Sequence, residues 1–332
     1  MMNNLNKYIK IKIFFLLLSL IILMFLSYLN FSLNKNIYND IKNSFIIKPG
    51  DSISKSLHEL QLENFIESVS RIKIILYLYD VSPRFINGKY FISKEDTEYS
   101  MLIKLIKGKI VQDSIIIYEG MTHNQIIDTL KKSKLIKYKK DGKYNEKIYS
   151  TKINYLSSEG LCFPDTYKFS SGINIDTFLA NCTKNMEKIV LKYWNNRDYS
   201  LPYKSPYEML IMASIIEKET SIDFEKPIVS SVFINRLNKG MRLQADPTVI
   251  YGMKNFKGNI TKKDLKENNE YNTYKINGLP RTPICSPGEI SIKAASKPEN
   301  TEYLYFVAND KGQHIFSKNY KDHVNAVNKY QK

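Results

Sequence analysis

The sequence is poor in residues that bind metals or form disulfides. Its 332 residues include three cysteines and four histidines, and no two cysteines stand in a Cys-x-x-Cys pair. An odd cysteine count argues against a disulfide scaffold, and the spacing matches no zinc site. One pair among Cys162, Cys182 and Cys285 can still form, and the sequence leaves all three pairings open. We therefore expect neither a metal site nor a cofactor.

The chain also lacks an internal repeat and a clustered basic face. It carries 49 Lys and Arg against 33 Asp and Glu, a net charge of +16. Such a charge suits nucleic acid, an anionic membrane surface or an acidic polymer. The lysines are scattered, however, with only short runs such as 137–140. With 43% hydrophobic residues the chain can form a core, and at roughly 100–200 residues per domain we expect two folded units.

An apolar run near the N-terminus predicts a transmembrane anchor. Residues 13–31 contain no charged side chain, and such a run is just long enough to cross a hydrocarbon core of about 30 Å. A cleaved signal peptide is the alternative, but it would end in small residues at its cleavage site. This run ends in the bulky sequence Ser-Tyr-Leu-Asn-Phe, which favours an uncleaved anchor.

The charges that flank this run predict its orientation. Three lysines precede it within residues 1–12, and no charge follows it until Lys35. Because positive charge stays on the cytoplasmic side, residues 1–12 are expected to be a cytoplasmic tail. After a linker at 32–44, the body would lie outside the cytoplasm, in a single-pass protein of the cytoplasmic (inner) membrane. This placement disfavours a nucleic-acid partner.

Residues 45–110 are predicted to form a small unit with the element order β-α-α-β-α. The segment Ser44–Ser52 gives a strand, a Pro-Gly turn and a helix cap. The apolar runs and turn residues that follow predict helices at 53–60, 68–79 and 99–107, and a strand at 87–92.

Residues 112–330 are predicted to form a larger α+β domain. A β-branched run predicts a strand at 114–118, and helices are expected at 122–130 and 176–193. Short strands and loops rich in Pro, Gly and Asn follow residue 240. The predicted fold class is therefore α+β, with an N-terminal transmembrane helix, a small module and a larger domain.

A further helix of the larger domain carries two carboxylates at its end. The segment Ser205–Glu208 is a capping box with Pro at the first helical position. The apolar residues that follow cover nearly every direction around the helix axis, so this helix should be buried. Glu217 and Glu219 stand at its C-terminal end, two residues apart, and therefore point about 160° away from each other.

The two carboxylates have different neighbours. Glu219 follows two isoleucines by one turn, whereas Glu217 follows an alanine and a serine. A carboxyl against branched apolar side chains loses solvation when it ionises, which raises its pKa and keeps it protonated near neutrality. Glu219 is thus the candidate acid, although a Glu-Lys-Glu helix end is also typical of ordinary solvated glutamates.

Longer strings around this helix resemble one known family. They are EGLCFPDTY at 159–167, ASIIEKET at 213–220, SVFINRL at 231–237, GMRLQADPTVIYGM at 240–253, YNTYKINGLP at 271–280, RTPICSPG at 281–288 and HIFS at 314–317. Together, from about Phe45 to Tyr330, they resemble the endolytic murein transglycosylases, the MltG/YceG-like family. The resemblance implies a LysM-like module at 45–110 and a YceG-like catalytic domain at 112–330, with Glu219 as the catalytic acid and base.

The same strings supply candidate substrate-binding residues. An Asp-Pro-Thr turn gathers polar side chains, and the Tyr-Asn-Thr-Tyr segment offers amides and aromatic faces of the kind that bind sugars. A contact that merely orders a loop is an equal alternative for each of them. The candidates are Gln244, Asp246, Thr248, Tyr251, Asn235, Asn272 and Tyr274. Glu217 and Arg236 are expected to support them, with Arg236 paired to a substrate carboxylate or to Glu217.

The resemblance further implies a lyase, a peptidoglycan lytic transglycosylase. Glu219 would protonate the bond oxygen between N-acetylmuramic acid and N-acetylglucosamine, then take the proton of the C6 hydroxyl that closes onto C1. A hydrolase would need a second carboxylate, for which Asp246 is the best candidate. The implied partners are peptidoglycan strands, whose elongation the family is thought to terminate, and peptidoglycan synthases. A non-catalytic peptidoglycan-binding scaffold is the alternative, and departures from the family pattern at Cys162 and Arg281 leave the subsites open.

Overall fold

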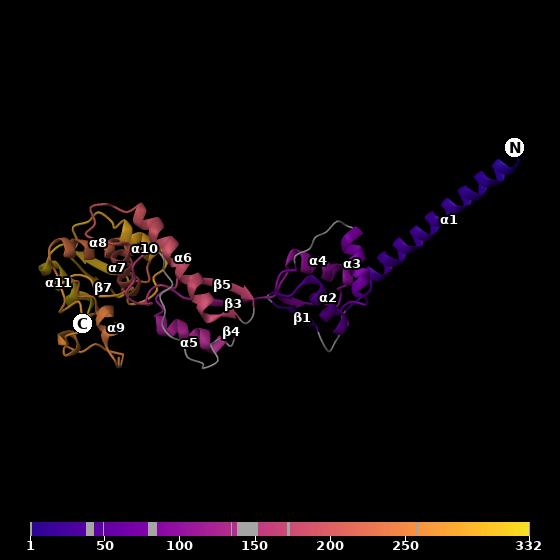
Figure 1. Ribbon diagram of the computed structural model, residues 1–332. Helices are drawn as coiled ribbons and strands as arrows, with labels where there is room; N and C mark the ends of the chain where they lie inside the picture. Colours follow the sequence, from indigo (N-terminus) through magenta and orange to yellow (C-terminus); the bar gives the residue numbers. More distant parts are fainter. Residues whose placement is uncertain are drawn as a thin grey trace. The chain divides into compact units, whose positions relative to one another are not determined.

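The computed structural model describes residues 2–37, 43–48, 50–78, 85–133, 135–137, 152–170, 173–256 and 258–331 (Figure 1). The chain divides into two compact units. The first comprises Met1–Asp113 with Phe169–Ser171, and the second comprises Ser114–Lys168 with Gly172–Lys332.

The first unit begins with helix α1, Met2–Leu33. Its segment Tyr8–Leu33 is long and apolar enough to cross a membrane, by length and composition alone. The helix extends beyond the predicted anchor at 13–31 in both directions. Its last turns are not free, because Leu29 and Leu33 are buried in the core of the first unit, and Ile37 from the predicted linker joins them.

The rest of the first unit shows the predicted order β-α-α-β-α, which is confirmed. The elements are β1 (Ser44–Ile47), α2 (Ile53–Leu62), α3 (Val69–Leu78), β2 (Gly88–Phe91) and α4 (Glu98–Lys107). Strands β1 and β2 pair antiparallel. Whether this module is LysM-like stays a prediction, and Pro49 of the predicted turn lies outside the described residues.

Local chemistry sets the helix ends of this module. Ser52 caps α2 by accepting a hydrogen bond from the backbone of Lys55, as the sequence predicts. Thr97 and Ser100 form a capping box at the start of α4, and Gly108, at φ 63°, ends it in the left-handed conformation that glycine tolerates best. These caps hold α4 against the end of α1.

The second unit mixes helices and strands, which confirms that part of the predicted fold class. Its elements are β3 (Gln112–Ile117), α5 (His123–Ser133), β4 (Ile136–Lys137), β5 (Asp165–Ser170), β6 (Ile173–Asn174), α6 (Ile175–Asn195), α7 (Pro206–Glu219), α8 (Lys226–Asn238), α9 (Asp246–Gly252), the 3-10 helix η1 (Asp264–Lys266), α10 (Glu289–Ser296), β7 (Tyr305–Ala308), β8 (His314–Ser317) and α11 (Tyr320–Tyr330). Strand β3 pairs with β5, β4 runs parallel to β6, and β7 and β8 form an antiparallel hairpin.

Helix α7 is the core of the second unit. It contacts α6, α8, α9 and α10, which surround it in Figure 1. Every residue from Met209 to Ile216 is buried, so the predicted burial on all sides is confirmed. Ser205 caps the helix by accepting from the backbone N–H of Glu208, while the Glu208 carboxylate accepts from the backbone of Lys204 rather than of Ser205.

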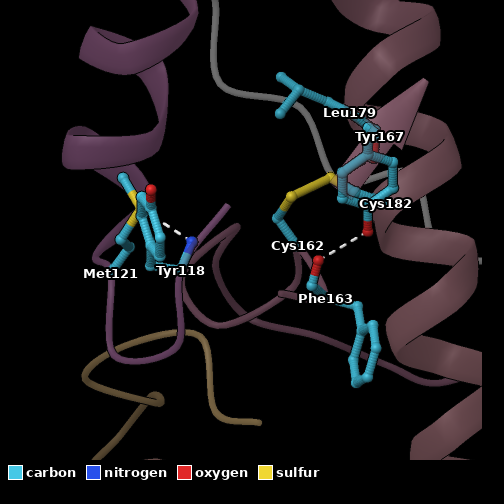
Figure 2. Close-up of a disulfide and its surroundings, with 7 residues drawn as sticks. All are labelled: Tyr118, Met121, Cys162, Phe163, Tyr167, Leu179 and Cys182. Atoms are coloured by element: carbon cyan, nitrogen blue, oxygen red, sulfur yellow. Dashed lines mark hydrogen bonds between the residues drawn. A yellow bond between two sulfur atoms is a disulfide. The ribbon is translucent and has the colours of Figure 1, made fainter. Parts of the chain in front are cut away.

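A disulfide joins the segment before β5 to helix α6. Cys162 pairs with Cys182, 20 residues further along the chain (Figure 2). The backbone N–H of Phe163 donates to the carbonyl of Cys182 at 3.2 Å and reinforces the same junction, and the Tyr167 hydroxyl donates to the carbonyl of Phe163 at 2.6 Å (Figure 2). Cys285 is a buried free thiol. The pairing that the sequence left open is therefore settled in favour of Cys162 and Cys182.

Removing this disulfide should destabilise the protein. Closing a loop of this length restricts the unfolded chain by about 3 kcal/mol, so the double substitution Cys162→Ser and Cys182→Ser is expected to lower the free energy of unfolding by about that amount. Urea unfolding followed by circular dichroism measures the loss. Wild type treated with a reductant serves as the matched control, and alkylation of the denatured, unreduced protein should label Cys285 alone. Labelling of all three cysteines would contradict the pairing.

Candidate active site

A cleft of about 450 Å³ opens at the C-terminal end of α7. Helices α7, α8, α9 and α11, the β7–β8 hairpin and the loops at 244 and 274 all contribute to its walls. The sequence-predicted residues that line it are Glu219, Arg236, Gln244, Asp246 and Tyr274. Five residues chosen from four separate strings of the sequence thus share one cavity.

Glu219 occupies the last position of α7 and is half-buried in the cleft wall. The pKa of its carboxyl is raised to about 8, chiefly by burial and in addition by the nearby Asp246 carboxylate, while the Arg236 guanidinium acts to lower it. The direction matches the one expected from the isoleucines that precede Glu219. A group with this pKa is mostly protonated at neutral pH and is able to give its proton away.

Glu217 faces a different part of the structure. Its carboxylate accepts hydrogen bonds from the backbone N–H of Gly288 at 3.0 Å and from the hydroxyl of Ser291 at 2.6 Å. Gly288 is the N-cap of α10, so a negative charge stands where the helix dipole favours it. The buried ammonium of Lys226 lies 3.6 Å from the same carboxylate. Glu217 and Glu219 therefore serve separate sites, as their spacing predicts.

Arg236 does not pair with Glu217, and that predicted alternative is wrong. Its Nε donates to the carbonyl of Leu304 at 2.7 Å and its Nη1 to that of Leu243 at 2.6 Å. The guanidinium lies 5.3 Å from the centre of the Tyr305 ring. Two carbonyls on separate segments thus hold this cation at the wall of the cleft.

Asp246 and Tyr274 form a hydrogen-bonded pair in the cleft. The Tyr274 hydroxyl donates to Oδ1 of Asp246 at 2.6 Å. Burial raises the pKa of Tyr274, and its hydrogen bond to Asp246 acts in the same direction. Gln244 stands beside them with a φ of 50°, in the left-handed region that is uncommon for residues other than glycine. Its backbone N–H donates to the carbonyl of Thr273 at 3.2 Å.

Thr248 and Asn272 do not line the cleft. The buried Thr248 hydroxyl donates to the carbonyl of Ala245 at 2.7 Å and lies 2.9 Å from the hydroxyl of Thr273. The buried side-chain amide of Asn272 donates to backbone carbonyls in the 264–267 turn, the shortest bond reaching Glu267 at 2.7 Å. Both side chains order the loops that carry the cleft residues.

Asn235 and Tyr251 also lie outside the cleft lining. The amide of Asn235 donates to the carbonyls of Thr301 at 2.8 Å and Tyr303 at 3.0 Å, which fixes the chain that leads into β7. The Tyr251 hydroxyl donates to Oε2 of Glu159 at 3.0 Å. For these residues the structure shows loop-ordering contacts, the alternative that the sequence left open.

The C-terminal hairpin and α11 complete the cleft with residues that the sequence analysis did not single out. Tyr305, His314, Tyr320 and His323 line it. His314 stands in the string at 314–317, and Tyr305 stands in YLYFVA at 303–308, which also resembles the family. Neither string indicates a contact with Glu219, because residues so far along the chain reach it only through tertiary folding. The ring of His323 stacks on Tyr305 with centroids 5.1 Å apart, and burial and then Arg236 lower the pKa of His323.

His314 is held by a carboxylate, Glu225. Its Nδ1 lies 2.7 Å from Oε2 of Glu225, and its backbone N–H donates to Oε1 at 2.8 Å. The Thr220 hydroxyl, next to Glu219, donates to the same carboxylate at 3.1 Å. Burial acts to raise the pKa of Glu225, but the hydrogen bonds from His314 and Thr220 outweigh it and lower the pKa. One buried carboxylate thus ties the end of α7 to β8.

The described residues contain no group of three or more His, Cys, Asp or Glu side chains arranged to hold a metal ion. The chemistry available in the cleft is therefore that of a protonated carboxyl, a neighbouring carboxylate, a guanidinium and several aromatic rings. This set is suited to proton transfer to a bound polymer whose flat faces lie on aromatic rings.

Comparisons with known proteins agree on one family. The model of the YceG-like family matches residues 45–329, and the chain belongs to this family. A crystal structure of a yceG-like protein from Listeria monocytogenes is 33% identical, with a TM-score of 0.54, and the match covers 85% of this chain and 98% of that one.

Two curated relatives carry a functional name. The endolytic murein transglycosylase of Bacillus subtilis is 40% identical over 174 residues, which are 52% of this chain and 48% of the relative. The endolytic murein transglycosylase of Streptococcus pneumoniae D39 is 29% identical over 176 residues, 51% of this chain and 31% of the relative. The chain thus spans about half, or less, of the length of the curated relatives it matches.

The raised pKa of Glu219 predicts a pH-dependent stability. Between about 4.5, its ordinary value, and about 8, the folded state holds this proton more tightly than the unfolded chain. Unfolding releases the proton in this window, so this group makes the protein less stable as pH rises. Glu219→Gln removes the effect. The full shift corresponds to roughly 4 kcal/mol between pH 5 and pH 9, and because solvent partly screens the half-buried Glu219, we expect the stability of Glu219→Gln relative to wild type to increase by about half of that, roughly 2 kcal/mol. Urea unfolding at both pH values measures this, and an unchanged difference would contradict the raised pKa.

Glu217→Gln, on the same helix, should destabilise the protein. It leaves the buried Lys226 with Asp223 as its ion-pair partner, a carboxylate that is 63% exposed. We expect a loss of about 2 kcal/mol in the free energy of unfolding, measured in the same urea experiment at pH 7. Glu219→Gln at pH 5 is the matched control. A neutral outcome for Glu217→Gln would show that Lys226 does not depend on it.

Proposed function

We propose that this chain is an endolytic peptidoglycan lytic transglycosylase. One observation carries the proposal: the Glu219 carboxyl, with a pKa raised to about 8, stands at the wall of an open cleft. The names of the curated relatives supply the substrate class, which is murein. Lytic transglycosylation needs a group that is first an acid and then a base, and a carboxyl that is protonated at rest fits the first step.

In the proposed reaction, Glu219 gives its proton to the oxygen that links N-acetylmuramic acid to N-acetylglucosamine. The C1–O bond breaks through an oxocarbenium-like state. The Glu219 carboxylate then takes the proton of the C6 hydroxyl as its oxygen bonds to C1, which closes a 1,6-anhydro ring. Glu219 is protonated again at the end, and no water is consumed. The negative charge of Asp246 favours both the proton on Glu219 at rest and the positive charge that develops on the sugar.

We further propose that α1 anchors the body outside the cytoplasm. The lysines before the apolar run support an inside N-terminus. The Cys162–Cys182 disulfide supports an oxidising compartment for the second unit. A LysM-like module beside the membrane would hold nascent glycan strands, and cleavage there would terminate strand elongation by the peptidoglycan synthases. These roles rest on the resemblance and on the order of the units along the chain.

A hydrolase is the second candidate function, because Asp246 lines the same cleft as Glu219. A glycoside hydrolase uses a second carboxylate to activate water or to attack the sugar. A third candidate, a peptidoglycan-binding scaffold without activity, does not account for the raised pKa of Glu219. The products separate all three possibilities.

Glu219→Gln should abolish cleavage of purified glycan strands, with a fall in rate on the order of 10²–10⁴-fold. Mass spectrometry of the wild-type digest should show 1,6-anhydro ends. Glu302→Gln, at an exposed carboxylate, is the matched control and should keep full activity. Reducing ends in place of anhydro ends would identify a hydrolase, and no cleavage by wild type would favour the scaffold.

The pH profile of cleavage should fall on its alkaline side near pH 8, because Glu219 loses its proton there. Asp246→Asn removes the neighbouring negative charge and should move this alkaline limb to lower pH, with activity retained at acidic pH. Initial rates between pH 5 and pH 9.5 measure both effects. If Asp246→Asn instead removed activity at every pH, Asp246 would be a second catalytic carboxylate.

A further inference from the structure

The junction between α1 and the first unit is built into that unit. Leu29 and Leu33 of α1 are each 6% exposed and belong to the same core as Phe45 and Tyr90. The apolar run of α1 ends at Phe31. At 1.5 Å of rise per residue, Leu33 lies only about 3 Å further along the helix axis. The residues that surround Leu33 therefore lie within a few ångströms of the boundary of the proposed membrane span.

An apolar pocket opens at this junction. It holds about 210 Å³, and its lining combines α1 with α3 and α4. The lining includes Leu33, Ile75, Leu76, Tyr99, Ile103 and Ile106. No charged side chain takes part in this lining.

Helix α3 also presents apolar side chains outward, on the face that points away from this pocket, so that its last turn is apolar on both faces. Ile74, Tyr77 and Leu78 are 44%, 85% and 55% exposed, and their spacing places them on one face of the helix. We call these three residues the α3 stripe. The residues between them, at 75 and 76, line the pocket. Lys73 is exposed one turn before Tyr77. Aromatic and lysine side chains next to an apolar surface are typical of membrane interfaces.

We propose that the first unit rests on the outer leaflet of the membrane through the α3 stripe and this pocket. The stripe enters the boundary between headgroups and acyl chains, the pocket receives the end of a phospholipid acyl chain, and Lys73 lies among the lipid phosphates. The occupant is the bilayer because the pocket includes Leu33, so the same helix that spans the lipid also forms the pocket wall. The proposal rests on α1 being a membrane span, as inferred under the proposed function.

Depth-dependent fluorescence quenching in nanodiscs tests this contact on the full chain. The sequence has one tryptophan, Trp194. In a Trp194→Phe background, a newly introduced tryptophan is therefore the only one that fluoresces. Tyr77→Trp places the reporter in the stripe, where an 85% exposed side chain tolerates the change. Ile46→Trp is the matched control, because Ile46 is 58% exposed on β1 of the same unit and is absent from the pocket lining. Leu20→Trp, within α1, reports the membrane span itself.

Nanodiscs with brominated phospholipids should quench most of the fluorescence of the Tyr77→Trp and Leu20→Trp proteins and leave that of the Ile46→Trp protein unchanged. Equal, weak quenching at positions 77 and 46, with strong quenching at 20, would overturn the docking while α1 still spans the membrane. Weak quenching at 20 would instead refute the membrane anchor. A reporter at 77 that is shielded from both brominated lipid and aqueous iodide would show that protein covers the stripe, and would also overturn the proposal.

Discussion

The burial of α7 on every side is the constraint on which the site depends. A helix with apolar side chains all round has no solvent-facing surface until its last turn, so the two carboxylates of that turn meet very different surroundings. Glu217 reaches the N-terminus of α10 and a buried lysine, where a negative charge is stabilised by a dipole and an ion pair. Glu219 reaches a cleft wall, where burial, the end of its own helix and Asp246 all oppose ionisation.

This division explains how one short Glu-Lys-Glu segment both stabilises the domain and provides chemistry. The charge of Glu217 holds α10 against α7, and α10 in turn covers the core from which Glu219 emerges. A carboxyl with a raised pKa makes the folded state less favourable at high pH, so its position must be maintained by other contacts. The Glu225 carboxylate accepts hydrogen bonds from the Thr220 hydroxyl and from the backbone N–H of His314, and these bonds fix the chain immediately after Glu219. The cost of burying the Glu219 carboxyl is thus offset by contacts that hold the chain on both sides of it.

Much of this could be predicted from the sequence, because the relevant signals are local. The order of elements in the small module follows from turns, caps and apolar runs, and the opposite directions of Glu217 and Glu219 follow from helix geometry alone. Contacts between segments that are distant in the sequence could not be predicted. Cys162 could pair with either other cysteine until folding brought α6 to it. His314 and Glu225 are 89 residues apart. The sequence also does not reveal whether a side-chain amide faces a substrate or the backbone. Asn235 and Asn272 donate to backbone carbonyls.

The neighbours of Glu219 also bear on whether one carboxyl is enough for both proton transfers of the proposed reaction. Asp246 has a hydrogen bond from Tyr274 on Oδ1, which directs that oxygen toward the protein rather than toward a water molecule. Arg236 is held by two backbone carbonyls, and its charge acts to lower the pKa of Glu219. The resulting site has one carboxyl that favours its proton and one carboxylate fixed by a tyrosine. In the reaction proposed above, this arrangement would raise the proton affinity of the acid before the bond breaks and would stabilise positive charge on the sugar afterwards. Since both effects require only the charge of Asp246, the geometry is consistent with Glu219 performing the acid and the base steps in turn.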